Sequence, residues 1–244
     1  MKAIILAAGR GSRMKRLTDE RPKCLVKLGG KLLIEWQLEA LSAAGINDIA
    51  IVTGYKKELL SQYKLTEFHN ARWFETNMVE SLICADKWLR LGPTIISYSD
   101  IFYEPSAVAS LINCPSPLAV TYDPNWLSIW QNRFEDPLSD AESFLLNSLN
   151  QIIEIGNKPS TVEEVQGQYM GLIRITPESW SHIVNVLEEF PRNKRAKMSM
   201  TRVLQTIIEK SKFTVTGVPY EDKWGEIDSE NDLELYNSGY LLEK

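Results

Sequence analysis

Charged residues are concentrated in a short segment near the N-terminus that also contains two glycines. The segment from Arg10 to Lys27 carries seven basic and two acidic side chains, a local charge of +5 in a chain of 244 residues whose net charge is −5. Gly9 and Gly11 let the backbone bend tightly and approach a ligand closely. Successive backbone N–H groups in such a turn bind anions. The segment is therefore predicted to bind a polyanion such as a triphosphate. The spacing of the glycines is neither that of a P-loop nor that of a three-glycine dinucleotide fingerprint. The alternative is an ordinary turn with a solvated basic flank.

Two aspartates further along the chain are candidates for binding a divalent metal. Asp100 follows the apolar run 94–98, and Asp228 follows the late apolar run 213–218. Carboxylate oxygens are the ligands that Mg²⁺ prefers, and the carboxyl ends of strands are where α/β sheets bind ligands. Taken singly, Asp100 is also consistent with a turn and Asp228 with a helix N-cap. Mg²⁺ is the predicted cofactor, and the neighbouring Glu226 is expected to support the fold or the surroundings of the metal.

The elements that must position these residues alternate between strands and helices. Short apolar runs typical of buried strands occupy residues 3–8, 49–52, 94–98, 118–122 and 213–218. Helical patterns occupy residues 31–44, 81–91, 177–190, 199–210 and 229–242. This rhythm predicts an α/β fold with a Rossmann-like, mostly parallel sheet flanked by helices. Residues 124–170 are expected to form a small inserted antiparallel or lid region, within a single domain that covers residues 1–244.

The composition argues against several classes of function. A net charge of −5 is unlike that of a general nucleic-acid binder, which needs a basic face. The three cysteines are widely spaced and only two histidines are present, which argues against a zinc site. The apolar runs are shorter than the roughly 18 residues that read as a membrane span. We expect no nucleic-acid or membrane partner, and a cytoplasmic location.

The N-terminal segment as a whole is similar to a family signature. The stretch Leu6-Ala7-Ala8-Gly9-x-Gly11-Ser12-Arg13-Met14-x-x-Leu17-Thr18-x-x-x-Pro22-Lys23-x-Leu25 resembles that of nucleotidyltransferases acting on sugar phosphates and amino-alcohol phosphates. The resemblance implies the nucleotidyltransferase fold, Mg²⁺ bound by Asp100 and Asp228, and catalytic roles for Arg13 and Lys23. It also implies nucleotide contacts for Leu6, Ala7, Ala8, Gly9, Gly11, Ser12, Arg13 and Lys23. The family usually has proline where this chain has Arg16, a departure in stiffness or charge that removes no needed group.

Segments in the centre of the chain narrow the resemblance to one branch. Thr76-Asn77-Met78-Val79-x-Ser81-Leu82, Trp126-x-x-x-Trp130-x-x-Arg133-Phe134 and Pro137-Leu138-x-Asp140-Ala141-Glu142 resemble phosphocholine cytidylyltransferase-like enzymes. Within that branch the resemblance points to the CTP:phosphoglutamine cytidylyltransferases of capsular phosphoramidate synthesis. It implies CTP as the nucleotide, with Asn77 and Ser81 near the base. An asparagine amide offers a donor and an acceptor to a cytosine edge, although asparagine is also a common helix N-cap.

The residues that bind the acceptor are less sharply indicated. Trp126 and Trp130 would share a helical face, which suits either a quaternary ammonium group or the core. Asp140 and Glu142 suit an amino group or are surface charges. Lys158 stands where related enzymes keep a lysine for the acceptor phosphate, or is a solvated hairpin residue.

The expected reaction is a direct in-line attack of the acceptor phosphate on the α-phosphorus of CTP, by a monomer or homodimer. A sugar-1-phosphate nucleotidyltransferase that uses another NTP is one alternative. A non-catalytic nucleotide-binding module is the other, and the presence of Lys23, Asp100 and Asp228 together argues against it.

Overall fold

A seven-stranded sheet lies at the centre of the computed structural model, which describes residues 1–210 and 213–240. The strands are β1 Lys2–Ala7, β2 Lys27–Leu28, β3 Lys31–Leu32, β4 Asp48–Thr53, β5 Thr66–His69, β6 Thr94–Tyr98, β7 Ile101–Tyr103, β8 Leu118–Asp123, β9 Phe144–Leu146, β10 Ile152–Ile155, β11 Gln168–Ile175, β12 Thr216–Pro219 and β13 Trp224–Glu226. The α-helices are α1 Leu33–Ala43, α2 Met78–Ile83, α3 Asp86–Leu89, α4 Pro105–Asn113, α5 Trp126–Arg133, α6 Pro177–Glu188, α7 Arg192–Arg195, α8 Met200–Lys210 and α9 Glu230–Leu235.

The order of the strands in the main sheet is β12-β8-β11-β6-β1-β4-β5. Neighbouring strands are parallel except at β11, which pairs antiparallel with both β6 and β8. Strand β1 lies between β4 and β6, because an apolar run that is buried on both faces suits an interior position. The prediction of an α/β fold with a mostly parallel sheet is confirmed.

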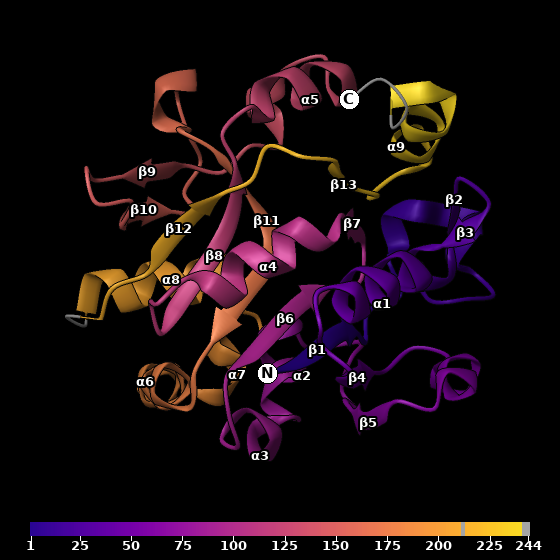
Figure 1. Cartoon of the computed structure of the whole chain (residues 1–244), viewed down its shortest axis with the longest axis horizontal. Coiled ribbons are helices and arrows are strands. Elements are labelled where there is room, and N and C mark those ends of the chain that lie inside the picture. Colours follow the sequence, from indigo (N-terminus) through magenta and orange to yellow (C-terminus); the bar gives the residue numbers. More distant parts are fainter. Residues whose placement is uncertain (211–212, 241–244) are drawn as a thin grey trace.

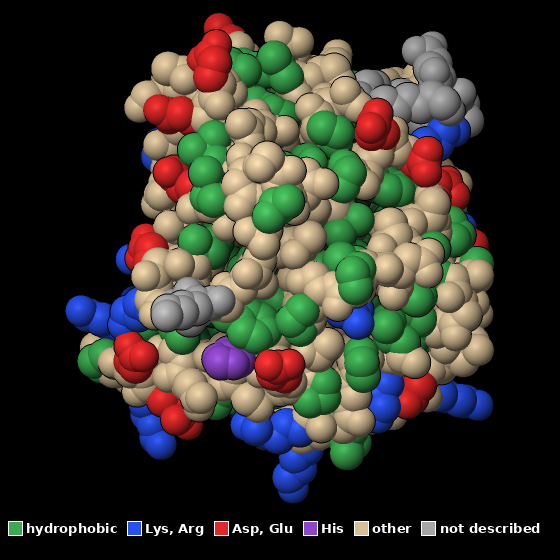
Figure 2. All heavy atoms as spheres, turned by 60° about the vertical axis from the view of Figure 1, so that its left-hand side comes forward, with side chains coloured by type: hydrophobic (Ala, Val, Ile, Leu, Met, Phe, Trp, Pro, Cys, Tyr) green, Lys and Arg blue, Asp and Glu red, His purple; other side chains and the backbone are tan. Residues whose placement is uncertain are grey.

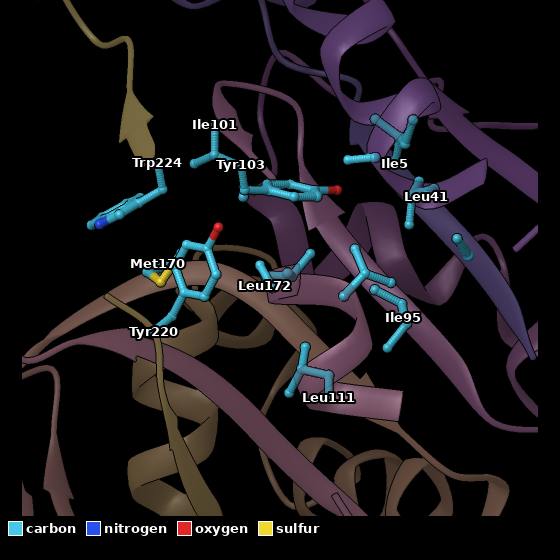
Figure 3. Close-up of a cluster of buried hydrophobic side chains, with 14 of the residues drawn as sticks. Ile5, Leu41, Ile95, Ile101, Tyr103, Leu111, Met170, Leu172, Tyr220 and Trp224 are labelled. Carbon is cyan, nitrogen blue, oxygen red and sulfur yellow. The ribbon is translucent and has the colours of Figure 1, made fainter. Parts of the chain in front are cut away.

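Apolar side chains cover both faces of this sheet. Along β1 they alternate, as strand geometry requires, so that Ile5 contributes to one layer and Ile4 to the other. Helices α1 and α4 cover the Ile5 face, and Figure 1 shows both helices crossing in front of the strands. Figure 3 shows Ile5, Leu41 and Leu111 in this layer. Helices α2, α3, α6 and α8 cover the opposite face.

Three predicted segments differ from the observed elements. The helix expected over 81–91 is two short helices, α2 and α3, and α3 begins at Asp86, which accepts hydrogen bonds from Arg90 and from the indole of Trp180. Residues 124–170 do contain an antiparallel hairpin, β9–β10, but also helix α5 and the start of β11, which lies inside the main sheet. The helix expected over 229–242 is α9 followed by a π-helical turn, Tyr236–Tyr240, and positions 241–242 lie outside the described residues.

Charged side chains of both signs are interspersed along the lower edge of the face shown in Figure 2. Apolar side chains are scattered over the middle of the same face. In the part of the chain that the structure describes, none of the helices combines the length and apolar character needed to traverse a bilayer.

Candidate active site

The N-terminal loop lies against Lys23. Strand β1 ends at Ala7, and the chain passes through Gly9 and Gly11 into a 3₁₀ helix, Ser12–Thr18. Gly11 has a left-handed backbone, with φ of 74°, and a Cβ at this position would lie 2.8 Å from the Cβ of Lys23. Glycine is therefore required at position 11 both by the backbone conformation and by the close approach of the lysine.

Lys23 links the two predicted metal ligands. Its side chain is only 8% exposed, and Nζ donates to Oδ2 of Asp100 at 2.9 Å and to Oδ1 of Asp228 at 2.5 Å. Arg13 reaches the same oxygen of Asp228 at 2.9 Å from the solvent side, with 66% of its side chain exposed. The structure thus brings together all four residues that the sequence predicted for catalysis and metal binding.

A small antiparallel pair of strands places the two aspartates side by side. Asp100 lies in the turn between β6 and β7, and Asp228 follows β13, which pairs with β7. The backbone N–H of Ile227 donates to the carbonyl of Asp100 at 2.9 Å. Ser229, and not Asp228, is the N-cap of α9. The carboxylate of Asp228 is therefore directed to the basic residues and not to the helix.

Burial and ion pairing together set the protonation of this cluster. Burial opposes a charge on Lys23, but Asp100 and Asp228 outweigh it and raise the pKa of the lysine. Burial alone would raise the pKa of Asp228, whereas Lys23 and Arg13 hold that pKa below its usual value. Burial and the neighbouring Asp228 and Asp100 carboxylates raise the pKa of Glu226 well above its usual value. A further cation in the cluster would favour the ionised form of Glu226.

The carboxylates of Asp100, Glu226 and Asp228 form a group suited to a hard divalent cation. Each offers one oxygen, and these oxygens lie within 4.8 Å of one another. Oδ1 of Asp100 is buried and has no hydrogen-bond partner among the described residues. Carboxylate oxygens are the ligands that Mg²⁺ takes from proteins. Glu226, which the sequence assigned to support, thus belongs to the candidate metal centre itself.

Arg133 is an important residue that the sequence reasoning did not assign to the site. Its side chain is completely buried, and its guanidinium pairs with Asp232, with Nε 2.8 Å from Oδ1, and more loosely with Glu226 at 3.5 Å. Asp232 in turn accepts hydrogen bonds from the backbone N–H groups of Asp228 and Ser229. Arg133 therefore connects helix α5 to the backbone that carries Asp228 and Glu226, two of the candidate metal ligands. Its place in the segment Trp130-x-x-Arg133-Phe134 was the available signal.

A cavity of about 270 Å³ opens beside Lys23 and contains most of the predicted nucleotide-binding residues. It is lined by Leu6, Ala8, Gly9, Gly11, Ser12, Arg13, Lys23, Trp73, Thr76, Asn77, Met78, Ser81, Tyr98, Ser99 and Asp100. Ala7 is the exception, because its side chain belongs to the core under the sheet. We call this cavity the nucleotide pocket.

Asn77 and Ser81 line the nucleotide pocket and also have structural roles. The side chain of Asn77 caps α2 by accepting a hydrogen bond from the backbone N–H of Met78 at 2.7 Å. The hydroxyl of Ser81 accepts a hydrogen bond from the buried amide of Asn70 at 2.9 Å. The N-cap alternative for Asn77 therefore holds alongside its position in the pocket.

Trp73 lines the nucleotide pocket, although the sequence did not point to it. Its ring packs against that of Tyr55, with centroids 5.2 Å apart. Gly54 lies beneath it, where a Cβ would be 2.6 Å from the Cβ of Trp73 and 2.5 Å from the carbonyl oxygen of Ala8. An aromatic face at the wall of a nucleotide pocket is suited to stacking on a base.

A second cavity, of about 250 Å³, adjoins the first and shares Arg13, Met78 and Tyr98 with it. Its other lining residues are Asp140, Glu142, Gln168, Tyr169, Met170, Gly171, Ser199, Met200, Thr201, Glu226 and Asp228. Asp100 thus lines the first pocket and Asp228 the second, and Lys23 is bonded to both. We call the second cavity the acceptor pocket.

Three residues that the sequence assigned to the acceptor lie elsewhere. Trp126 and Trp130 are 2% and 1% exposed, pack on each other in the core and line neither pocket. Their burial corrects the prediction that they present aromatic faces to a ligand. The Nζ of Lys158 donates to the backbone carbonyls of Leu138 and Ser139, so this lysine fastens the loop before Asp140 and does not line the pocket.

Comparisons with known proteins identify the family of the chain. Residues 3–153 match the MobA-like NTP transferase domain. The CTP:phosphoglutamine cytidylyltransferase of Campylobacter jejuni is 38% identical over 96% of this chain and 98% of that protein. The choline-phosphate cytidylyltransferase of Streptococcus pneumoniae is 45% identical over 34% of this chain and 38% of that protein. The solved inositol-1-phosphate CTP transferase from T. maritima has a TM-score of 0.77 at 19% identity and covers 98% of this chain and 96% of its own. The fold of that structure is shared over nearly the whole chain.

Proposed function

The chain belongs to the MobA-like NTP transferase family, and on that premise we propose that it is a cytidylyltransferase. It condenses CTP with a small phosphorylated metabolite and releases pyrophosphate and a CDP-linked product. The observation that carries the proposal is the position of Lys23, whose ammonium group bonds to an aspartate from each of the two adjoining pockets. CTP as the nucleotide is supported by the similarity to cytidylyltransferases of phosphoglutamine and choline phosphate.

The reaction is a single displacement at phosphorus. An oxygen of the acceptor phosphate attacks the α-phosphorus of CTP, and a new P–O bond forms. The bond from the α-phosphorus to the oxygen that bridges it to the β-phosphate breaks, and pyrophosphate leaves with the electron pair. The attacking oxygen is already anionic, so no general base is needed.

Lys23 and Arg13 supply the positive charge that this displacement needs. The raised pKa of Lys23 keeps its ammonium charged at neutral pH. When phosphate oxygens replace the aspartates as its partners, the ammonium stabilises charge that develops on the reacting and leaving oxygens. Arg13 lines both pockets, so it holds the two phosphate groups near one another and lowers the entropic cost of the reaction.

Asp100, Glu226 and Asp228 are the residues that would hold Mg²⁺. When bound, such an ion neutralises phosphate charge and acts as a Lewis acid. The buried Oδ1 of Asp100, which has no hydrogen-bond partner among the described residues, and the grouping of three carboxylate oxygens within 4.8 Å support this assignment.

The proposal is tested by a screen for pyrophosphate release. The four NTPs are each combined with phosphocholine, phosphoethanolamine, phosphoglutamine and several sugar 1-phosphates, with Mg²⁺ and with EDTA. We expect release with CTP and a small phosphorylated amine, and none with EDTA. Release with UTP or dTTP and a sugar phosphate, but none with CTP, would overturn the proposal in favour of the sugar-1-phosphate alternative. Nucleotide binding without release from any pair would support the non-catalytic alternative.

A further inference from the structure

We propose that the acceptor pocket contains a subsite for a primary ammonium group, formed by Asp140, Glu142 and Gln168. The preferred acceptors are then phosphorylated amines or amino acids that carry –NH₃⁺, and not sugar phosphates or quaternary ammonium compounds. This inference rests on the proposed function, because it names the class of acceptor that the same enzyme uses.

Two carboxyl groups line the pocket, and the protein provides little compensation for their negative charge when they are ionised. Burial raises the pKa of both Asp140 and Glu142. The cations near Asp140 are engaged elsewhere, since Arg133 pairs with Asp232 and Arg13 with Asp228. Glu142 accepts a long hydrogen bond, 3.4 Å, from the hydroxyl of Thr201. A cationic ligand would favour the ionised form of both groups.

Gln168 supplies an independent indication that a hydrogen-bond donor belongs here. It is 8% exposed and lines the same pocket, and its Oε1 is buried with no hydrogen-bond partner among the described residues. A buried acceptor without a partner destabilises the folded protein, because its hydration is lost and no hydrogen bond replaces it. The N–H of a ligand is a partner that would remove this cost.

A β-bulge places Gln168 at the pocket. The pairing of β11 with β8 shifts register between Tyr169 and Ile173. Gly171 lies inside the shift with φ of 79°, and a Cβ there would be 2.8 Å from the ring of Tyr98. Such bulges redirect the side chains of a strand. Residues 168–171 all line the acceptor pocket, although the rest of β11 belongs to the main sheet.

The arrangement matches the chemistry of a primary ammonium group. An –NH₃⁺ group has three donors and a positive charge, and the pocket offers two carboxylates and one amide oxygen as acceptors. A trimethylammonium group has no N–H, and a sugar hydroxyl has no charge. The tryptophan pair that the sequence suggested for a quaternary group, Trp126 and Trp130, is buried in the core.

The acceptor pocket also contains groups suited to a phosphate. Arg13 lines the same cavity as Asp140 and Glu142, and it lines the nucleotide pocket as well. A molecule that carries a phosphate and an ammonium group would therefore find groups of opposite charge to both within one cavity.

Three acceptors with the same two-carbon spacer test the inference: phosphoethanolamine, phosphocholine and ethylene glycol monophosphate. With CTP and Mg²⁺, we expect kcat/KM for phosphoethanolamine to exceed that of either other compound by about 10- to 100-fold, the value of a charged hydrogen bond. Equal or higher kcat/KM for phosphocholine or for the glycol would overturn the inference and leave the cytidylyltransferase assignment standing. If the enzyme preferred phosphoethanolamine but reacted with UTP or dTTP and not with CTP, this result would support the inference and overturn the cytidylyltransferase assignment.

Variants of the subsite separate recognition from folding. Glu142→Gln should raise KM for phosphoethanolamine about tenfold or more without changing KM for CTP or for ethylene glycol monophosphate. Gln168→Leu should act in the same direction. The exposed Glu163 lines neither pocket, so Glu163→Gln is the matched control and should leave all three constants unchanged. If KM rose equally for all acceptors in both variants, with KM for CTP unchanged, the proposed ammonium subsite would be overturned.

Discussion

The two adjoining pockets treat their polar groups in opposite ways. In the nucleotide pocket, Lys23 bonds to Asp100 and to Asp228 of the adjoining pocket, so these charges compensate one another before any ligand binds. In the acceptor pocket, Glu142 has one long hydrogen bond and Oε1 of Gln168 has no partner among the described residues. A compensated pocket exchanges partners when a triphosphate binds. An uncompensated one discriminates strongly between ligands that do and do not satisfy it.

Removal of Asp228, which pairs with Lys23 from the adjoining pocket, should have the largest effect on the reaction. Asp228→Ala deletes a candidate metal ligand and leaves Lys23 with Asp100 as its remaining close carboxylate. We expect kcat for pyrophosphate release to fall about 1,000-fold or more. The exposed Asp222 serves as the matched control, and Asp222→Ala should retain full turnover. Unchanged turnover in Asp228→Ala, with circular dichroism as in the wild type, would contradict the assignment of Asp228.

Removal of the lysine charge should have the next largest effect. Lys23→Met keeps the length of the side chain but leaves Asp100 and Asp228 without their shared cation. Loss of one preorganised charge of this kind lowers kcat about 100-fold. Steady-state and single-turnover measurements of pyrophosphate release would establish this. Lys27→Met changes an exposed lysine from the same segment and should be silent. A rise in KM with kcat unchanged would show that Lys23 only binds the nucleotide.

Arg133 offers a way to disturb the compensated pocket from a distance. Arg133→Lys keeps the charge but loses the planar fork that holds Asp232, and with it the backbone at Asp228. We expect kcat to fall about tenfold and the affinity for Mn²⁺, measured by electron paramagnetic resonance, to fall with it. Arg133→Met removes the charge entirely and should lower Tm further, because it leaves Asp232 buried and unpaired. Normal Mn²⁺ affinity in Arg133→Lys would sink the positioning role.

Removal of a carboxylate from the acceptor pocket should have the smallest effect, a change in the thermal stability of the ligand-free protein. Burial raises the pKa of Glu142. The contribution of this group to the free energy of unfolding is therefore fully present below its ordinary pKa of 4.5, and it is lost as the pH rises through the higher pKa of the folded protein. Glu142→Gln should therefore raise Tm of the ligand-free protein by about 2 °C at pH 7.5, with no gain near pH 4. Differential scanning fluorimetry at both pH values measures this. A lower Tm at pH 7.5 would mean that the ionised carboxylate stabilises the fold.

The parts of the structure that the sequence predicted well are governed by local pattern. Strand β1 and helix α1 have unambiguous apolar periodicity, and the glycine-rich segment has a specific signature. The antiparallel insertion of β11 into the sheet depends on pairing with β6 and β8, which no local pattern encodes.

The residues of the candidate site also fall into two groups, those that a local pattern predicts and those that depend on long-range contacts. Lys23, Asp100 and Asp228 were found because they lie at strand ends or in a signature. Arg133 and Gln168 acquire their positions from contacts with residues far away in the sequence. The spacing of Trp126 and Trp130 alone could not assign them to a pocket or to the core.

Gly11 has a consequence for how this site can change in evolution. A Cβ at position 11 would lie 2.8 Å from the Cβ of Lys23, an atom that every residue except glycine would also place there. Because the left-handed backbone at position 11, with φ of 74°, disfavours other residues as well, glycine is expected to persist there even where the lysine is replaced. A side chain at position 11 would therefore indicate a chain whose loop follows a different path, away from position 23.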